Sequence, residues 1–178
     1  MQYPESRPFK IAVVGPESTG KSTMANYLAA QLDSFAVPEY ARYYCQHLNR
    51  EYSLQDEVNM FYGQVALEEA FLIRNPQVLV CDTTILTVKI WCDHLFQHTP
   101  AEVTDEIQRR PYDLYLLMDI DLPWEDDPLR DFPNERAHFM NIWKQELNSL
   151  HARYEIISGT GEQRLENGLQ AVQKIMQG

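Results

Sequence analysis

The sequence predicts an α/β fold in which a parallel sheet is wound by right-handed crossovers. Short apolar runs alternate along the chain with longer segments whose apolar residues recur at helical spacing, as strands alternate with helices in such folds. In addition, the apolar run at residues 9–14 is followed at once by Gly15-Pro16-Glu17-Ser18-Thr19-Gly20-Lys21-Ser22. This is the pattern G-x-x-x-x-G-K-[ST], which forms a phosphate-binding loop when a strand precedes it and a helix follows it.

The segment after this motif has the spacing of the required helix. Met24, Leu28 and Leu32 recur every four residues, so we expect a helix to about residue 33. The helix N-terminus and the backbone N–H groups of the loop favour bound phosphate. Lys21 is expected to reach the β- and γ-phosphates, and the Ser22 hydroxyl to ligate Mg²⁺. The expected nucleotide-binding residues are Gly15, Glu17, Ser18, Thr19, Gly20, Lys21, Ser22 and Thr23.

Length and composition are those of a single globular domain, residues 1–178, that can bury a substantial core. With 26 acidic and 15 basic residues the net charge is −11, which argues against a broad nucleic-acid-binding surface. The three cysteines have no CxxC spacing, as expected in a reducing cytosol. No signal peptide and no apolar run of about 18 residues is present. We therefore expect a cytoplasmic protein without nucleic-acid or membrane partners; the sequence is silent on oligomeric state.

The first half of the chain supplies a tail, two more strands and a long helix. Residues 1–8 are polar and contain two prolines, which predicts a short tail. Residues 35–38 predict a short strand that ends at its proline. A long helix is expected from Ser53-Leu54-Gln55-Asp56, which approximates a capping sequence, to Arg74. The continuous apolar run at residues 78–81 is typical of a strand buried on both faces.

Two shorter helices and a strand are expected next. Residues 85–95 have helical spacing. Thr99-Pro100-Ala101-Glu102 predicts a capped helix, with the proline at its first position, that ends near Arg110. The apolar run at residues 112–118 predicts the fourth strand.

Residues 122–134 differ in character from the rest of the chain. They contain three prolines, four acidic residues and Arg130, and they have no sustained apolar period. We expect a mobile lid, about residues 122–137, that leads into a helix over residues 134–151. The remaining expected elements are a strand at 154–157, a loop at 158–161 and a terminal helix marked by Leu165, Leu169, Val172 and Met176.

Two acidic residues follow predicted strands at the edge where ligands bind. In open α/β sheets the ligand crevice lies outside the carboxyl ends of the strands, which is where Glu39 and Asp82 are expected. Asp82 occupies the position of a Mg²⁺-organising carboxylate, although an acid in a surface turn or a helix cap would look the same. Glu39 can take the proton of an acceptor hydroxyl, and either acid can fill either role. Arg42 is a candidate acceptor ligand or an ordinary salt-bridge partner of Glu39.

Two arginines lie in or beside the expected lid. Arg130 and Arg136 can reach the γ-phosphate as negative charge builds there, and Arg130 is favoured because it lies within the arm. Both can instead belong to a solvated charged face among the neighbouring acids.

Aromatic side chains near the crevice segments can stack on a planar acceptor ring, or they can belong to the core. The five histidines do not suggest zinc, because the pair His94 and His98 lacks a third ligand. The aromatic candidates are Tyr40, Tyr43, Tyr44, Phe61, Tyr62 and Trp91.

Several motifs are more particular than the phosphate-binding loop. Together with the loop, they resemble the ribosylnicotinamide kinase domain of the bacterial NadR-type proteins, a branch of the P-loop kinases in the AAA-type ATPase-like family. The resemblance runs from Phe9 to the terminal helix. The motifs are Pro38-Glu39-Tyr40-Ala41-Arg42, Gly63-Gln64, Cys81-Asp82-Thr83, Pro123-Trp124 and Asp127-Pro128-Leu129-Arg130.

The resemblance implies a P-loop kinase fold with a five-stranded parallel sheet of order 2-3-1-4-5, sandwiched by helices. It implies transfer of phosphate from ATP, with Mg²⁺, to the 5′-hydroxyl of nicotinamide riboside, a small-molecule substrate, giving nicotinamide mononucleotide in NAD salvage. Its site residues fall in three groups: Lys21, Glu39, Asp82 and Arg130 are catalytic; Ser22 and Asp82 hold the metal; Glu39, Tyr40, Arg42, Gln64 and Asp82 bind the acceptor.

Multidomain members of that family add adenylyltransferase and DNA-binding domains, for which 178 residues leave no room. We therefore expect a stand-alone kinase domain without a DNA-binding role. The alternatives are a kinase of another nucleoside or small metabolite, and an ATPase switch that acts through a partner protein. A GTPase is disfavoured, because Asn-Lys-x-Asp is absent and no glycine stands three residues after Asp82. Adenine contacts are expected from the loop at residues 158–163.

Overall fold

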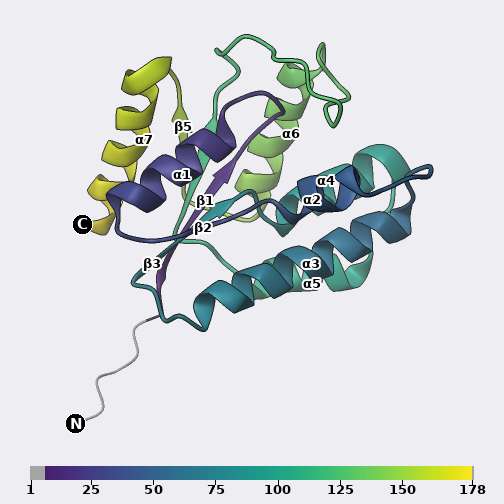
Figure 1. The fold of residues 1–178 in the computed structure, drawn as a ribbon, viewed down its shortest axis with the longest axis horizontal. Coiled ribbons are helices and arrows are strands. Elements are labelled where there is room, and N and C mark those ends of the chain that lie inside the picture. The colour runs from purple at the N-terminus through teal and green to yellow at the C-terminus, as the bar shows by residue number, and fades with distance from the viewer. Residues whose placement is uncertain (1–6, 178) are drawn as a thin grey trace.

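Five parallel strands form one central sheet in the computed structural model, which describes residues 7–177 (Figure 1). The order across the sheet is β2-β3-β1-β4-β5 and every ladder is parallel, which confirms the order that the resemblance implies. Residues 1–6 of the predicted tail lie outside the described residues. The strands are β1 (Phe9–Val14), β2 (Ala36–Val37), β3 (Val78–Asp82), β4 (Leu114–Met118) and β5 (Tyr154–Ile157).

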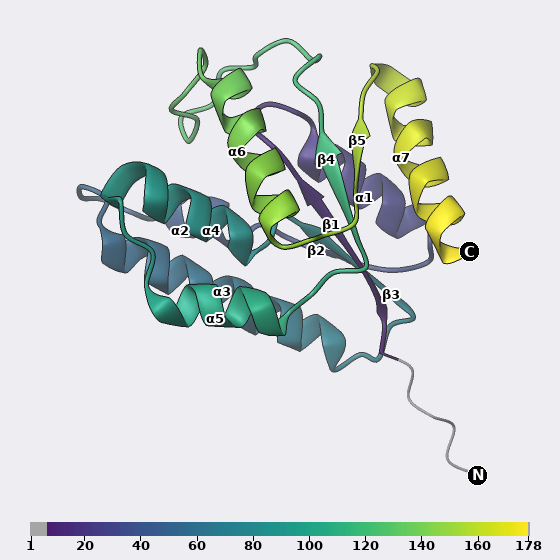
Figure 2. The same cartoon turned by 180° about the vertical axis from the view of Figure 1, so that it is seen from behind.

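Helices cover both faces of this sheet, as Figures 1 and 2 show from opposite sides. One face is covered by α1 (Lys21–Gln31) and α7 (Gly161–Met176). The other face is covered by α3 (Leu54–Leu72), α4 (Ile85–Trp91), α5 (Ala101–Arg109) and α6 (Arg136–Ser149). This confirms the predicted sandwich. Among residues 7–177, no helix combines the length and the apolar character needed to cross a membrane.

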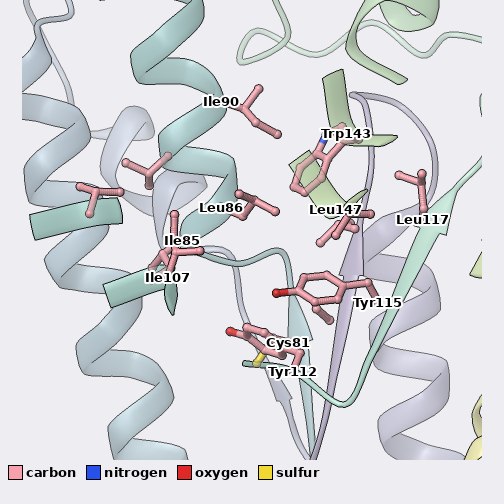
Figure 3. Close-up of a cluster of buried hydrophobic side chains, with 14 of the residues drawn as sticks. Cys81, Ile85, Leu86, Ile90, Ile107, Tyr112, Tyr115, Leu117, Trp143 and Leu147 are labelled. Carbon is pink, nitrogen blue, oxygen red and sulfur yellow. The ribbon is translucent and has the colours of Figure 1, made fainter. Parts of the chain in front are cut away.

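The central strand β1 divides its side chains between two cores. Ala12 and Val14 pack beneath α3 to α6, in the core that Figure 3 draws in part. Ile11 and Val13 pack beneath α1 and α7, and all four residues are fully buried. Successive side chains of a strand point to opposite faces, so a strand covered by helices on both sides must be apolar throughout. This explains the continuous apolar runs of the sequence.

The two predicted helix caps have different outcomes. Ser53 begins α3 through a capping box, in which its backbone N–H donates to the Asp56 carboxylate at 2.8 Å. At α5 the predicted cap is wrong, because the helix begins at Ala101, after the proline, and the Thr99 hydroxyl donates to Asp93 at 2.7 Å. The Thr99 hydroxyl thus binds Asp93 and does not cap the N-terminus of α5.

Two local structures were not predicted from the sequence. Helix α2 (Tyr40–Gln46) follows β2, and a π-helix (Cys92–Phe96) continues α4. The predicted helix at residues 85–95 is therefore two helices of different pitch, which aim their side chains differently. Both unpredicted segments contribute residues to the wall of the cavity next to the phosphate-binding loop.

Candidate active site

The phosphate-binding loop is held in place by close backbone packing. Gly15 follows β1 at φ 138°, and a Cβ atom there would lie 2.9 Å from the Met118 carbonyl oxygen at the end of β4. Gly20 has φ 77° and directly precedes α1. The Thr19 hydroxyl donates to the Pro16 carbonyl at 2.8 Å within the loop. The loop geometry thus requires both glycines of the motif, and it ends at a helix N-terminus suited to phosphate.

Lys21 lies among carboxylates that come from different segments. Its ammonium group donates to the Pro16 carbonyl at 2.8 Å, which leaves its other N–H donors for phosphate oxygens. Burial lowers the pKa of Lys21, and the charges of Glu39, Asp82 and Glu17 oppose that shift. The structure therefore brings the predicted lysine and both predicted crevice acids together.

Asp82 and Ser22 have the chemistry of a magnesium site. Asp82 ends β3 and is 7% exposed, and within residues 7–177 its buried Oδ1 atom has no hydrogen-bond partner. Burial raises the pKa of Asp82, while the Ser22 hydroxyl and Lys21 oppose this. No group of three or more His, Cys, Asp or Glu side chains in the described chain is placed to hold a metal. A carboxylate and a hydroxyl fit Mg²⁺, which takes one or two protein oxygens and completes its shell with phosphate and water.

In the structure, Asp82 does not cap a helix and Arg42 does not form a salt bridge with Glu39, which were the alternative roles for these two residues. Helix α4 is capped by Thr84, whose hydroxyl accepts from the backbone N–H of Leu86 at 3.2 Å, so Asp82 is not its cap. Arg42 pairs with Asp127 of the lid at 2.9 Å and not with its neighbour in sequence, Glu39. Glu39 precedes α2, and burial raises its pKa, with Lys21 the main opposing charge.

The lid segment, residues 122–134, contains no helix or strand and lies across the phosphate-binding loop. The Ser18 hydroxyl accepts from the backbone N–H of Glu125 at 2.8 Å and from the Arg130 guanidinium at 3.4 Å. The Ser18 carbonyl accepts from Arg136 at 3.4 Å. Both predicted arginines thus face the loop and not a solvated charged face. The mobility of the lid stays a prediction.

A cavity of about 820 Å³ connects this loop to an aromatic end. Its size falls within the range of roughly 300–1,000 Å³ that is usual for small-molecule sites. At the aromatic end, the Tyr52 ring stacks on Phe96 with centroids 6.0 Å apart. The Trp91 ring lies 5.1 Å from that of Phe139. One continuous cavity therefore offers a polar, phosphate-binding end and an end suited to a planar ring.

The predicted acceptor residues are only partly brought to this cavity. Glu39, Arg42, Gln64 and Trp91 line it, whereas Asp82 is not among the lining residues. Tyr40 packs on Gly63, where an added Cβ would lie 2.1 Å from the tyrosine ring, and its backbone N–H donates to Gln64 at 2.9 Å. In the part of the chain that the structure describes, Tyr40 thus positions the start of α2 and does not form the cavity wall. The other aromatic candidates also lie outside the lining residues: Tyr43, Tyr44, Phe61 and Tyr62.

Sequence reasoning missed Arg164, which connects the phosphate-binding loop to the segments beside it. Arg164 is 4% exposed and donates to the carbonyls of Thr19 at 3.0 Å, Asp119 at 2.8 Å and Gly159 at 3.1 Å. It therefore joins the phosphate-binding loop to the end of β4 and to the loop at 158–163. An arginine in the first turn of an amphipathic helix gives no sequence signal of such a role.

Three lining residues at the aromatic end were also missed: Tyr52, Glu57 and Phe96. Their sequence context offers little to find them. Tyr52 stands in a connection, Phe96 ends the unpredicted π-helix, and Glu57 is one of two acids in the first turn of α3, a common place for exposed carboxylates.

Comparison with known proteins gives a consistent result. The family model of an AAA domain matches residues 10–164. The trifunctional NAD biosynthesis/regulator protein NadR of Salmonella typhimurium is 30% identical over 149 residues, which are 78% of this chain and 36% of that protein. This chain thus spans about a third of the length of that relative, and the predicted resemblance to NadR-type proteins is confirmed.

Solved structures show the same fold. A crystal structure of NadR protein in complex with NR has a TM-score of 0.78 at 20% identity, and covers 98% of this chain and 53% of that chain. A NadR protein in complex with NAD and AMP-PNP has a TM-score of 0.74 at 21% identity, and covers 96% of this chain and 50% of that chain.

Proposed function

The chain belongs to the AAA domain family, and on this premise we propose that it is an ATP- and Mg²⁺-dependent kinase of a nucleoside 5′-hydroxyl. Nicotinamide riboside is the favoured acceptor, and nicotinamide mononucleotide the product. The observation that carries the proposal is the single cavity that joins the phosphate-binding loop, Glu39 and a lid arginine to an aromatic end. The NadR relative and the complex of a NadR protein with NR support the choice of acceptor. The three free cysteines fit a cytoplasmic location.

In the proposed reaction, the acceptor 5′-oxygen attacks the γ-phosphorus of ATP. The bond between that phosphorus and the β,γ-bridging oxygen breaks, and ADP leaves. Glu39 accepts the hydroxyl proton, and its raised pKa moves it towards neutral pH, where a general base is most effective. Lys21 and Arg130 donate hydrogen bonds to the phosphate oxygens on which negative charge builds.

We assign Asp82 and Ser22 to Mg²⁺ and keep Glu39 as the base. The assignment is supported by the unpartnered Oδ1 atom of Asp82 among the described residues and by the Ser22 hydroxyl beside that carboxylate. When bound, the metal ion neutralises charge on the phosphates. The end of β3 and the start of α1, which carry these two residues, would hold the ion beside the phosphate-binding loop.

Release of ADP from ATP with Mg²⁺ tests the proposal, measured with nicotinamide riboside, ordinary ribonucleosides, deoxyribonucleosides and no acceptor. We expect stimulation by nicotinamide riboside and loss of turnover in Lys21→Ala, with Lys174→Ala, a change of an exposed lysine on α7, as the control. Stimulation by another nucleoside would replace the proposed acceptor. ADP release that ignores every acceptor would favour a partner-dependent ATPase, and full activity of Lys21→Ala would contradict the proposal.

A further inference from the structure

The aromatic end of the cavity contains one carboxylate in otherwise uncharged surroundings. Its wall is built from α2, the connection before α3, the first turns of α3 and the π-helix. Among its members, Glu57 is the one with a carboxyl group. We call the part of this end around Glu57 the far pocket, and its residues are Cys45, Leu48, Tyr52, Glu57, Met60 and Phe96.

Glu57 is buried with little compensation from the protein. It is 1% exposed, and within residues 7–177 it accepts one hydrogen bond, from the Tyr52 hydroxyl, and forms no ion pair. Burial raises its pKa to about 7, and the Tyr52 hydrogen bond opposes that shift. A carboxylate has about four acceptor positions on its two oxygens, so most of its capacity is unused.

The preceding residue shows what a compensated carboxylate looks like in this helix. Asp56 is 0% exposed and accepts hydrogen bonds from Arg50 at 2.6 Å, from Tyr44 at 2.7 Å and from Ser53 at 2.6 Å. The Arg50 guanidinium and these hydroxyls hold the pKa of Asp56 well below its usual range. Within residues 7–177, Glu57 has no such set of donors, and it borders the cavity, so a bound ligand can supply the missing donor and positive charge.

We propose that Glu57 selects the base of the acceptor: its carboxylate accepts a hydrogen bond from a ring carboxamide N–H and favours a positively charged ring. This inference rests on the proposed function and deepens it, since the nicotinamide ring of nicotinamide riboside carries both features. The stacked rings of Tyr52 and Phe96 supply apolar surface for a planar heterocycle beside that carboxylate.

The sharpest consequence concerns nicotinic acid riboside, which carries a carboxylate in place of the carboxamide. A second carboxylate facing Glu57 would place like charges together in a poorly solvated pocket, and it has no N–H to donate. Neutral pyrimidine nucleosides lack the ring charge. We expect the wild-type protein to prefer nicotinamide riboside to nicotinic acid riboside by about 10- to 100-fold in kcat/KM, the range for a hydrogen bond to a charged group.

Glu57→Gln separates this role from a structural one. A glutamine carbonyl can still accept the Tyr52 hydrogen bond, so a residue that merely anchors Tyr52 would leave the preference unchanged. If Glu57 selects the base, the preference should change. The glutamine amide has no negative charge, and it can donate a hydrogen bond to the carboxylate of nicotinic acid riboside. We expect the preference to fall by about tenfold or more.

Glu68→Gln is the matched control. Glu68 is a buried carboxylate of the same helix, but it contacts Tyr112 and Lys10 and does not line the cavity. The Glu68→Gln substitution should lower stability but leave the ratio of the kcat/KM values for the two ribosides unchanged. Thermal unfolding of both variants checks that each one folds.

Each outcome of this experiment is decisive. Equal kcat/KM values for the two ribosides in the wild-type protein overturn the inference, whether or not the variants fold. An unchanged ratio of these kcat/KM values in folded Glu57→Gln also overturns it. In both cases phosphorylation of nicotinamide riboside leaves the proposed function standing. If the wild-type protein phosphorylates neither riboside, the proposed acceptor is wrong, and the inference fails with it.

Discussion

Helix α3 buries two glutamates near opposite edges of the sheet, and they differ in what surrounds them. Glu68 accepts a hydrogen bond from Tyr112 at 2.5 Å and lies 3.7 Å from the Lys10 ammonium group, which stands over the Tyr112 ring. Glu57 accepts a hydrogen bond from Tyr52 and borders the cavity. Their exposures are 0% and 1%, so burial alone does not distinguish them. Among the described residues, the difference lies in a nearby cation, which Glu68 has and Glu57 lacks.

This difference separates the two edges of the molecule. Near the start of β1, Glu68 has a hydrogen bond from Tyr112 and a cation 3.7 Å from its Oε2 atom, although Oε2 accepts no hydrogen bond among the described residues. At the carboxyl edge, the effect of burial outweighs that of the neighbouring protein groups at Glu57 and Asp82, and it raises the pKa of both. Uncompensated buried groups lower stability, and they mark places where a ligand or a metal ion supplies what is missing.

Removal of Glu68 should have the largest effect on stability. Glu68→Ala leaves Lys10, which is 8% exposed, as a buried cation without its partner. We expect a loss of about 3–5 kcal/mol in the free energy of unfolding, measured by urea denaturation at pH 7. Glu69→Ala is the control, because Glu69 pairs with Arg110 on the surface, where such pairs contribute about 0–1 kcal/mol. Similar small losses in both variants would remove the distinction between the two edges.

Asp82→Asn should lower activity strongly and should not lower the free energy of unfolding. It removes the carboxylate assigned to Mg²⁺, so we expect kcat/KM to fall by about 10²- to 10³-fold, as for loss of a principal charge-stabilising group. Because that carboxylate is buried with an unpartnered Oδ1 atom among the described residues, the free energy of unfolding should hold or rise. ADP release over a range of Mg²⁺ concentrations and urea denaturation measure the two effects. Wild-type activity in this variant would show that Asp82 does not organise the metal.

The pH dependence of stability distinguishes Glu57 from its neighbour Asp56. Burial raises the pKa of Glu57 from 4.5 to about 7, so the folded state binds this proton more tightly than the unfolded state does. Its unfavourable contribution is therefore absent below pH 4.5, grows as the pH rises to 7 and then stays constant. We expect Glu57→Gln to gain up to about 3 kcal/mol over the wild type between pH 4 and pH 8.

Asp56→Asn serves as the comparison with the opposite sign. The pKa of Asp56 is held low, chiefly by Arg50, so its favourable contribution is present near neutral pH and is lost as the pH falls through the acidic range. The loss caused by Asp56→Asn should therefore shrink on acidification, as followed by urea denaturation. Parallel pH profiles for the two variants would contradict the account of Glu57.

The smallest expected effect is at the cap of α3. Ser53→Ala removes the hydroxyl of the capping box, and we expect a cost of about 1 kcal/mol in the free energy of unfolding. Because Ser53 is next to Tyr52, the KM for the acceptor should rise slightly while the KM for ATP stays constant. Steady-state kinetics with each substrate varied in turn measures this, and a change in the KM for ATP alone would contradict it.

The sequence was sufficient for the strands of the sheet and for the phosphate-binding loop itself, although not for Arg164, which supports that loop. Apolar runs with acids at their ends located β3 and Asp82, and the motif located Lys21 and Ser22, because these residues are adjacent in the chain to the elements that position them. Arg130 could be identified by its place in a segment of unusual composition. These predictions depend on local spacing, which a sequence shows directly.

Apart from Trp91, the aromatic end could not be predicted, because it is assembled from segments that meet only in the folded chain. Asp56 and Glu57 are adjacent acids in one helical turn, and their opposite surroundings depend on Arg50, on Tyr52 and on the π-helix that brings Phe96 to Tyr52. The lid ion pair of Arg42 joins residues 85 positions apart. No local spacing distinguishes such partners from solvated charges.

The central claim is that this protein transfers the γ-phosphate of ATP to nicotinamide riboside. The most direct measurement follows ATP labelled at the γ-phosphate in the presence of Mg²⁺ and nicotinamide riboside, with Lys21→Ala as the control. We predict that the label appears in the 5′-phosphate of nicotinamide mononucleotide, identified by mass spectrometry, and that the control forms none. Label found only in inorganic phosphate, at the same rate with and without the riboside, would contradict the claim.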